Sequence, residues 1–345
     1  MFDTFSSSYP AEQSSIPELR ILLRHDGKET DLRAITVTEY GATPALEEIP
    51  TPEPGQGQVL IKIRAAGMNP MDRTLASGDW KPMPATFPMV LGADGAGIVE
   101  KLGEGTSKFS VGVDLFYQLL IPPLGSAGTY AEHVAVTEDA PLVRVPAGLD
   151  DVVAASLPTA GGAALGCVDL LEPLTGKTVL IVGAGGGVGS FATQFAVNAG
   201  ANVIANVRER DAERMRAYGA GETIDDTQVS LPDAVRSAHP DGIDALLDVV
   251  SDAADFAELA SLVRRGGTAV TTRYVADRDA LGAAGVTGIN FAMQPSSKLF
   301  ERVAGAVADG RIVAPPITRI SLEEVPAAMD PAQAGPASGK TVITL

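Results

Sequence analysis

The stretch Val179-Leu-Ile-Val-Gly-Ala-Gly-Gly-Gly-Val-Gly-Ser190 decides the fold. A four-residue apolar run leads into a glycine cluster, and apolar residues at helical spacing follow until Ala199-Gly200, so the order predicts a strand, a tight turn and a helix. Glycines let backbone N–H groups approach a pyrophosphate at a helix N-terminus, where the dipole favours negative charge. A flexible glycine-rich linker is the competing interpretation, but linkers lack an apolar strand and helix on either side. We therefore predict a dinucleotide-binding turn.

The strand-and-helix alternation continues beyond this turn. Apolar strands are expected at 178–182, 202–207, 245–250 and 268–272, with helices between them that end at Gly200 and Gly219. This order predicts an open parallel sheet of the doubly wound type. The segment 286–291 is expected to be its last strand, 298–308 a helix, and 340–345 a short further strand.

The first part of the chain has a different texture. Short strand-like runs at 33–38, 58–64, 95–101, 114–119 and 130–136 are separated by glycine and proline turns, which favours a β-barrel-like domain. Helices are expected at 151–157 and 160–171. Residues 1–31 begin with a Ser-, Pro- and Gln-rich run, and we expect them to be a disordered extension.

Length, charge and cysteine usage limit the possible functions. A chain of 345 residues favours roughly two domains. The formal net charge of −17 argues against nucleic acid or an anionic membrane as the main partner. We see no secretory signal and no apolar run long enough to span a membrane. The single cysteine, Cys167, excludes an intrachain disulfide, and we expect it to be buried and the protein to be cytoplasmic.

Several strings occur in a fixed order, and together they resemble the medium-chain dehydrogenase/reductase superfamily, in its zinc-free quinone oxidoreductase branch. The strings are Ala66-Gly-Met-Asn-Pro-Met-Asp72, Pro88–Glu100, Gly128-Thr-Tyr-Ala-Glu-His133, Leu157–Ala164, the glycine motif, Tyr218-Gly-Ala220 and Gly339-Lys-Thr-Val-Ile343. The resemblance implies an α/β protein with a GroES-like catalytic domain (32–154 and 293–345) and a doubly wound Rossmann domain for NADP (155–292).

The resemblance also bears on zinc. In zinc-dependent relatives a cysteine ligand stands where this chain has Asn69, and a histidine stands where it has Ala93 of Gly92-Ala-Asp94. The four-cysteine structural lobe is absent, and the three histidines are scattered. Because catalytic zinc needs Cys, His or carboxylate ligands, we predict no metal site.

Without a Lewis acid, the expected chemistry is hydride transfer to acceptors that are already electrophilic, which are quinones and α,β-unsaturated carbonyl compounds. Asn69 could donate a hydrogen bond to the acceptor oxygen, with Asp72 one turn further on. Alternatively, Asn69-Pro70 caps a helix and Asp72 supports it. Tyr117 could line the pocket or donate a proton, although core packing is an equal alternative. Thr159 matches a position that commonly touches the cofactor in the family.

The second strand of the sheet bears on the choice of cofactor. NAD sites usually carry an acidic residue there that binds the ribose hydroxyls, and this chain has Asn206 followed by Arg208 and Arg210. Arginines can bind the 2′-phosphate of NADPH, which we therefore expect. Alternatively, the two arginines lie at a solvated helix start and pair with Glu209 and Asp211. The other cofactor contacts that we expect are Ala184, Gly186, Gly187, Val188, Gly189, Val249 and Thr272.

Our leading interpretation is an NADPH-dependent, zinc-independent quinone or enone reductase. One alternative keeps the fold and reduces enoyl thioesters or alkenals. The other is an NADPH-binding sensor or partner protein with weak catalysis. The family resemblance also implies a homodimer joined through the edge strand at Val286–Phe291, because an unpaired apolar edge is a liability.

Overall fold

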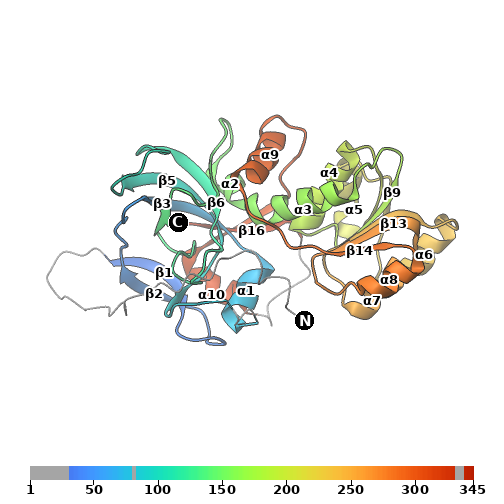
Figure 1. Ribbon diagram of the computed structural model, residues 1–345, viewed down its shortest axis with the longest axis horizontal. Helices are drawn as coiled ribbons and strands as arrows, with labels where there is room; N and C mark the ends of the chain where they lie inside the picture. Colours follow the sequence, from blue (N-terminus) through green and yellow to red (C-terminus); the bar gives the residue numbers. More distant parts are fainter. Residues whose placement is uncertain (1–30, 80–82, 331–337) are drawn as a thin grey trace. The chain divides into compact units, whose positions relative to one another are not determined.

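The computed structural model describes residues 31–79, 83–330 and 338–345 (Figure 1). The disorder predicted for residues 1–31 falls outside the described residues except at Asp31, which is the first residue of strand β1 (Asp31–Val37). Among the described residues, none of the helices has the length and apolar character needed to cross a bilayer.

A six-stranded sheet contains the glycine-rich segment. Its strands run parallel in the order β11-β10-β9-β12-β13-β14. Their bounds are β9 (Thr178–Val182), β10 (Asn202–Asn206), β11 (Glu222–Ile224), β12 (Ile243–Asp248), β13 (Val263–Thr271) and β14 (Thr287–Asn290). β14 is an edge strand, which confirms the edge predicted at 286–291.

Helices cover both faces of this sheet. Val179 and Ile181 pack in one apolar cluster with α3 (Pro158–Leu171), α4 (Gly187–Asn198) and α5 (Glu209–Ala217). Leu180 and Val182 face a second cluster with α6 (Leu231–Ala238), α7 (Ala253–Ala260) and α8 (Arg278–Ala284). Successive side chains of one strand thus enter opposite cores, which explains the unbroken apolar run. The doubly wound α/β fold is confirmed.

The strand, turn and helix at 178–198 form as the sequence predicts. Gly183 ends the strand with φ +81°, a backbone conformation that glycine adopts without strain. Gly186 is the N-cap of α4. A Cβ atom on Gly189 would lie 2.2 Å from the carbonyl oxygen of Gly183, so the helix packs on the turn more closely than any side chain permits.

The rest of the described chain forms a mainly antiparallel assembly. A seven-stranded sheet contains β3 (Gln58–Gly67), β5 (Asp94–Leu102), β6 (Asp114–Gln118), β7 (His133–Thr137), β8 (Leu142–Arg144), β15 (Ile317–Ser321) and β16 (Lys340–Thr344). A three-stranded sheet joins β1 to β2 (Ala45–Pro50) and β4 (Met89–Val90). The remaining helices are α1 (Pro70–Ser77), α2 (Asp151–Ser156), α9 (Ser297–Ala308), the 3₁₀ turn η1 (Leu322–Glu324) and α10 (Val325–Met329).

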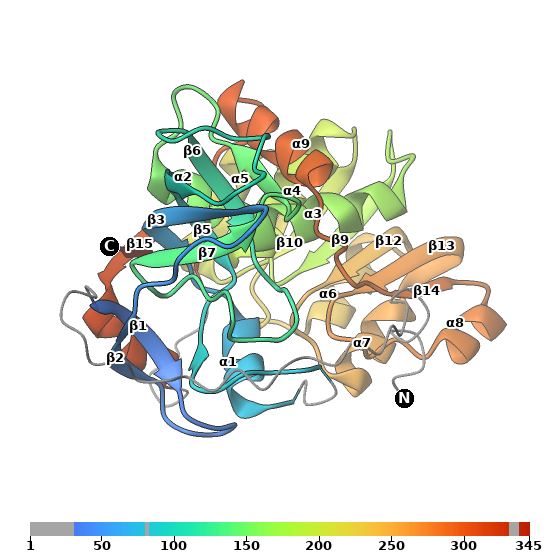
Figure 2. The ribbon, with the colours of Figure 1, turned by 60° about the vertical axis from the view of Figure 1, so that its left-hand side comes forward.

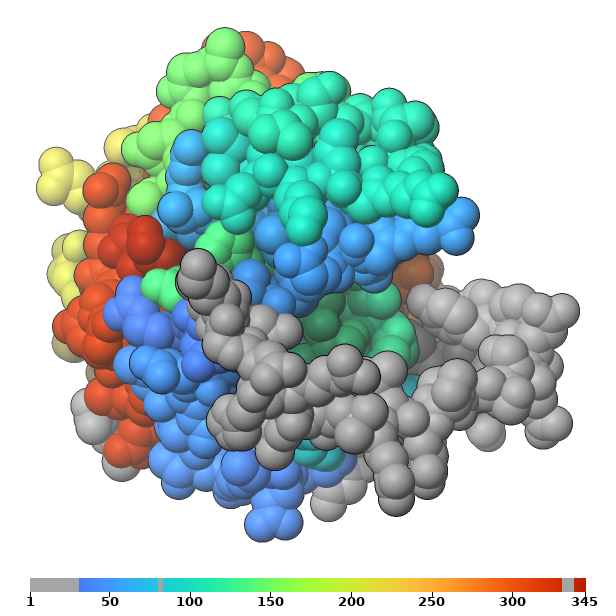
Figure 3. All heavy atoms as spheres, turned by 90° about the vertical axis from the view of Figure 1, so that its left-hand side faces the viewer, coloured from blue at the N-terminus to red at the C-terminus, as the bar shows by residue number. Residues whose placement is uncertain are grey.

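The C-terminal strand returns to this assembly. β16 pairs antiparallel with β3 through Val342–Thr344, and β15 pairs with β16. Figure 2 shows β15 beside the C-terminus, and in Figure 3 residues coloured orange to red lie beside the blue residues of the first strands. The return of the C-terminal segment to the GroES-like part is therefore observed, while the domain bounds given above stay a prediction.

Some element ends differ from the predicted ones. β7 begins at His133, because Ala131 makes only an isolated bridge to Ala34. β12 ends at Asp248, so Val249 lies beyond the strand. β2 was not predicted, because its residues are all exposed or only partly buried and so carry no apolar alternation.

Candidate functional site

Helix α1 positions the first candidate residues. Asn69 is extended (φ −135°, ψ 150°), Pro70 opens the helix, and Gly78 ends it in the left-handed conformation. One oxygen of the Asp72 carboxylate, Oδ2, accepts hydrogen bonds from the Asn69 backbone N–H (2.7 Å) and the Tyr130 hydroxyl (2.6 Å). Asp72 therefore supports the helix start, and the side chain of Asn69 is left for other contacts.

That side chain connects three elements. Asn69 Nδ2 donates to Asp94 Oδ2 at 3.0 Å and more weakly to the Gly67 carbonyl at 3.4 Å. Asp94, the first residue of β5, also accepts from the Thr159 hydroxyl (2.6 Å) and backbone N–H (3.1 Å). Gln118 Nε2 donates to the same hydroxyl at 2.5 Å, and Gln118 Oε1 is buried without a partner.

Lys340 completes the network from the opposite end of the chain. Its Nζ donates to Asn69 Oδ1 and to the Met68 carbonyl, both at 2.7 Å. We call Asn69, Asp72, Asp94, Thr159 and Lys340 the Asn69 cluster. The structure thus brings together three residues named from the sequence, Asn69, Asp72 and Thr159, with two that were given no role.

Burial dominates the electrostatics of the Asn69 cluster. Asp72 and Asp94 are 1% and 0% exposed, and Lys340 is 6% exposed. Burial raises the pKa of Asp72 to about 7, against the lowering effect of its hydrogen bonds. Burial likewise raises the pKa of Asp94 and lowers the pKa of Lys340, because each charged form loses water. One buried cation thus lies among two carboxyl groups.

The side chains around Asn69 include few of the types that bind zinc. Within the described ranges, no group of three His, Cys, Asp or Glu side chains comes close enough to hold a metal. The donors around Asn69 are an amide, one carboxylate and a hydroxyl, with an ammonium beside them.

Tyr117 lies outside the Asn69 cluster. Its ring packs among the apolar side chains of β3, β5 and β7, and its hydroxyl has no partner. Burial raises the pKa of Tyr117 well above its ordinary range. Because successive side chains of a strand leave opposite faces, Gln118 faces Thr159 and Tyr117 does not. Its catalytic role stays a prediction, and the packing alternative describes its position.

The expected cofactor residues lie at the carboxyl ends of the strands of the parallel sheet. The turn 183–189 follows β9, Asn206 ends β10, and Val249 and Thr272 follow β12 and β13. Backbone N–H groups join these ends: Val249 donates to Val182, and Thr272 donates to Asp248. Ligands of open α/β sheets bind at the carboxyl ends of the strands, so the glycine cradle and these strand ends fit a dinucleotide.

The two arginines after β10 differ in their surroundings. Arg208 Nη1 donates to Asp226 Oδ1 at 2.5 Å, and both side chains are more than 40% exposed. Arg210 Nε lies 3.4 Å from Asp211 Oδ2. Asn206 is 6% exposed, and its Nδ2 donates to the Ile224 carbonyl. Of the ion pairs of our alternative interpretation, the structure contains the one between Arg210 and Asp211, whereas Arg208 pairs with Asp226 and not with Glu209. Phosphate binding by Arg208 must compete with its pair.

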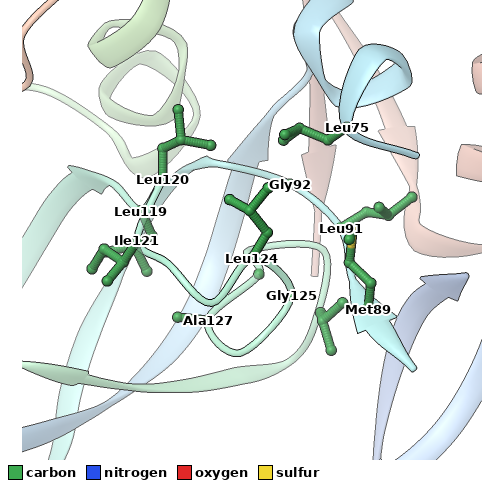
Figure 4. Close-up of a pocket in the computed structure, with 12 residues that line it drawn as sticks. Leu75, Met89, Leu91, Gly92, Leu119, Leu120, Ile121, Leu124, Gly125 and Ala127 are labelled. Atoms are coloured by element: carbon green, nitrogen blue, oxygen red, sulfur yellow. The ribbon is translucent and has the colours of Figure 1, made fainter. Parts of the chain in front are cut away.

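An apolar pocket lies next to the Asn69 cluster along the chain (Figure 4). It is lined by Leu75 of α1, by Gly92 just before β5 and by Leu119 just after β6, and the N–H of Leu119 donates to the Ala93 carbonyl. The other lining residues are Met89, Val90, Leu91, Leu120, Ile121, Leu124, Gly125, Ala127 and Gly128. Its cavity volume is about 20 Å³, which is room for about one water molecule, so a larger ligand would need the lining side chains to move.

Two protein-family models match parts of this chain. The family model of the alcohol dehydrogenase GroES-like domain matches residues 55–147, and that of the zinc-binding dehydrogenases matches 187–288. The chain is 31% identical to the mitochondrial NAD(P)H oxidoreductase RTN4IP1 of Mus musculus, over 84% of this chain and 82% of the relative. It is 28% identical to the chloroplastic NADPH-dependent alkenal/one oxidoreductase of Arabidopsis thaliana, over 91% and 79%. The structure of the quinone oxidoreductase from Coxiella burnetii superimposes with a TM-score of 0.81 at 26% identity, over 92% and 100%.

Proposed function

Because this chain belongs to the medium-chain dehydrogenase/reductase superfamily and is a quinone oxidoreductase-like member, we propose that it uses NADPH to reduce quinones or α,β-unsaturated carbonyl compounds without a metal ion. The chain is an oxidoreductase of this family. The choice of cofactor, the class of acceptor and the independence from zinc are what we propose.

The Asn69 cluster is the observation that carries the zinc-free part of the proposal. Catalytic zinc is held by three protein ligands drawn from Cys, His and carboxylates. Asn69 offers an amide whose oxygen already accepts from an ammonium. A fixed positive charge at that place repels a metal ion, so Lys340 supports a reaction that runs without one.

The glycine cradle supports a nicotinamide dinucleotide. Gly186 is the N-cap of α4, and the backbone N–H groups of a helix N-terminus suit the pyrophosphate of a dinucleotide. Asn206 in place of an acidic residue and Arg208 beside it favour a 2′-phosphate, hence NADPH. When bound, the cofactor supplies a hydride from its nicotinamide ring.

The chain's own residues would then hold the acceptor and its oxygen. The apolar side chains around Leu119 would have to move apart to take the apolar part of the molecule, because the cavity of about 20 Å³ between them holds about one water molecule. Asn69 Nδ2 has one firm hydrogen bond, to Asp94, and one weak contact at 3.4 Å, to Gly67. The hydrogen in the weak contact is therefore the one that Asn69 could give to the oxygen of an enolate or phenolate.

Relatives also favour a second candidate acceptor. The Arabidopsis protein carries alkenals and enones in its name, so an alkenal reductase of the same fold remains a candidate. The test is NADPH oxidation with quinones, enones, alkenals and enoyl thioesters, each with and without a chelator. We expect turnover with quinones or enones that survives chelation. Binding of NADPH without turnover on any acceptor would support a sensor instead, and loss of activity with loss of a bound zinc ion would overturn the zinc-free reaction.

A further inference from the structure

Lys340 is the residue that joins the glycine-rich turn to the Asn69 cluster. The backbone N–H of Gly339 donates to the Gly185 carbonyl at 3.0 Å, and Gly186 and Gly339 form a parallel bridge. The Lys340 stem then crosses the start of α4: a Cβ atom on Gly187 would lie 2.7 Å from Lys340 Cδ. The side chain of Lys340 therefore extends from the glycine-rich turn to Asn69.

The ammonium fixes the orientation of the Asn69 amide. A lysine can only donate hydrogen bonds, so the atom of Asn69 that faces Nζ must be the carbonyl oxygen. The Asp94 carboxylate can accept from Nδ2 on the other side. An amide without these two neighbours could flip, and its oxygen would then face the acceptor oxygen and repel it.

The charged groups around Lys340 come from two elements. Asp72 on α1 and Asp94 on β5 both lie close enough to act on the ammonium, and Tyr130 reaches it through Asp72. Lys340 has a third N–H that no described residue accepts. The cation is buried, and two of its N–H groups hold it in place.

We propose that Lys340 is a positioning residue for the reduction: it holds Asn69 with Nδ2 available to the acceptor and links that orientation to the cofactor turn. This role rests on the proposed function. It differs from a direct part in proton transfer, because Lys340 acts through Asn69.

The test is a double-mutant cycle. We expect Lys340→Met to lower kcat/KM for the acceptor at least tenfold, mainly through kcat, while the Kd for NADPH changes less than threefold. In an Asn69→Ala background the same substitution should change kcat/KM less than twofold. Lys340→Arg should recover part of the activity, because it restores a cation and a donor. Lys298→Met, at an exposed position of α9, is the matched control and should behave as wild type.

Equal effects of Lys340→Met in both backgrounds would overturn the positioning role. If Asn69→Ala leaves no measurable turnover, the test is the comparison of Lys340→Arg with Lys340→Met. An equal loss of kcat/KM in these two variants contradicts the proposal. Equilibrium unfolding gives a readout that needs no activity. Without Lys340, Asp72 and Asp94 hold protons to higher pH, so the unfolding free energy of Lys340→Met should fall more steeply with rising pH than that of wild type. If the protein turns over and the effects of the two substitutions on kcat/KM are additive, the positioning role alone is wrong. If no acceptor is reduced, the proposed function is wrong.

Discussion

Replacing Gly189 by alanine should damage both the fold and the cofactor site. The added Cβ would lie 2.2 Å from the carbonyl oxygen of Gly183 and 2.5 Å from Cα of Ala184. Both neighbours are backbone atoms, so no side chain can turn aside, and α4 must move away from the end of β9. Overpacking of this kind costs about 1–3 kcal/mol, and rigid neighbours place Gly189→Ala near about 3 kcal/mol.

The same displacement moves the N–H groups at the start of α4. A loss of about 1.4 kcal/mol in cofactor binding corresponds to roughly tenfold in Kd, and we expect at least that for NADPH. Gly305→Ala is the matched control, because Gly305 lies within α9 with no atom near its Cβ position. Alanine is favoured over glycine in a helix by about 0.8–1 kcal/mol, so this variant should melt at a higher temperature and bind NADPH normally.

Thermal melting and titration of NADPH fluorescence measure both effects. A Gly189→Ala protein that melts with wild type and binds NADPH with the wild-type Kd would refute the close approach of α4 to the turn.

Three further predictions follow from the site and the sheet edge. Arg208→Ala should raise the Kd for NADPH by about 2- to 30-fold and leave NADH unchanged, because a phosphate contact of about 1.5–3 kcal/mol replaces an exposed ion pair worth about 1 kcal/mol. Equal loss for both cofactors contradicts this role. The pKa of Asp72 is about 7 in the folded chain and about 4 when unfolded, so the unfolding free energy should fall as pH rises between these values. Asp72→Asn should flatten that dependence in urea titrations, and an unchanged slope would show that Asp72 is not its source. Sedimentation should give a dimer of twice 35.5 kDa. Phe291 donates its N–H to β13, so the N–H of Asn290 faces the open edge, and Asn290→Pro should give a monomer where Asn290→Ala does not. A dimer that survives the proline places the interface elsewhere.

The sequence predicted the elements whose signals are local. The run from Val179 to Ser190 contains its own strand, turn and helix start, because each depends on neighbouring residues only. Asn69 and Asp72 were found in the same way, from one short string. The edge position of β14 followed from its place after the last strand of the alternation.

Lys340 could not be found in that way. It lies 271 residues from Asn69, and only the pairing of β16 with β3 brings them together. Lys340 belongs to the string Gly339–Ile343, which contributes to the family resemblance, but a lysine after a glycine carries no local sign of burial. The position of Tyr117 could not be predicted for a related reason: whether it or Gln118 faces the Asn69 cluster depends on the phase of β6, which is set by the pairing of that strand with β5.

Because β16 is the last strand to be made, its pairing with β3 also determines when the Asn69 cluster can form during synthesis. Chains grow at about 5–20 residues per second, so Lys340 is added roughly 15–55 seconds after Asn69. During that interval Asp72 and Asp94 exist without the cation that they later surround, and β3 lacks one of its neighbouring strands. The parallel sheet, by contrast, has all its strands by Asn290. The strands of the parallel sheet are thus made before Lys340, whereas the contact of Gly339 with the glycine-rich turn and the complete Asn69 cluster form only once β16 has been made.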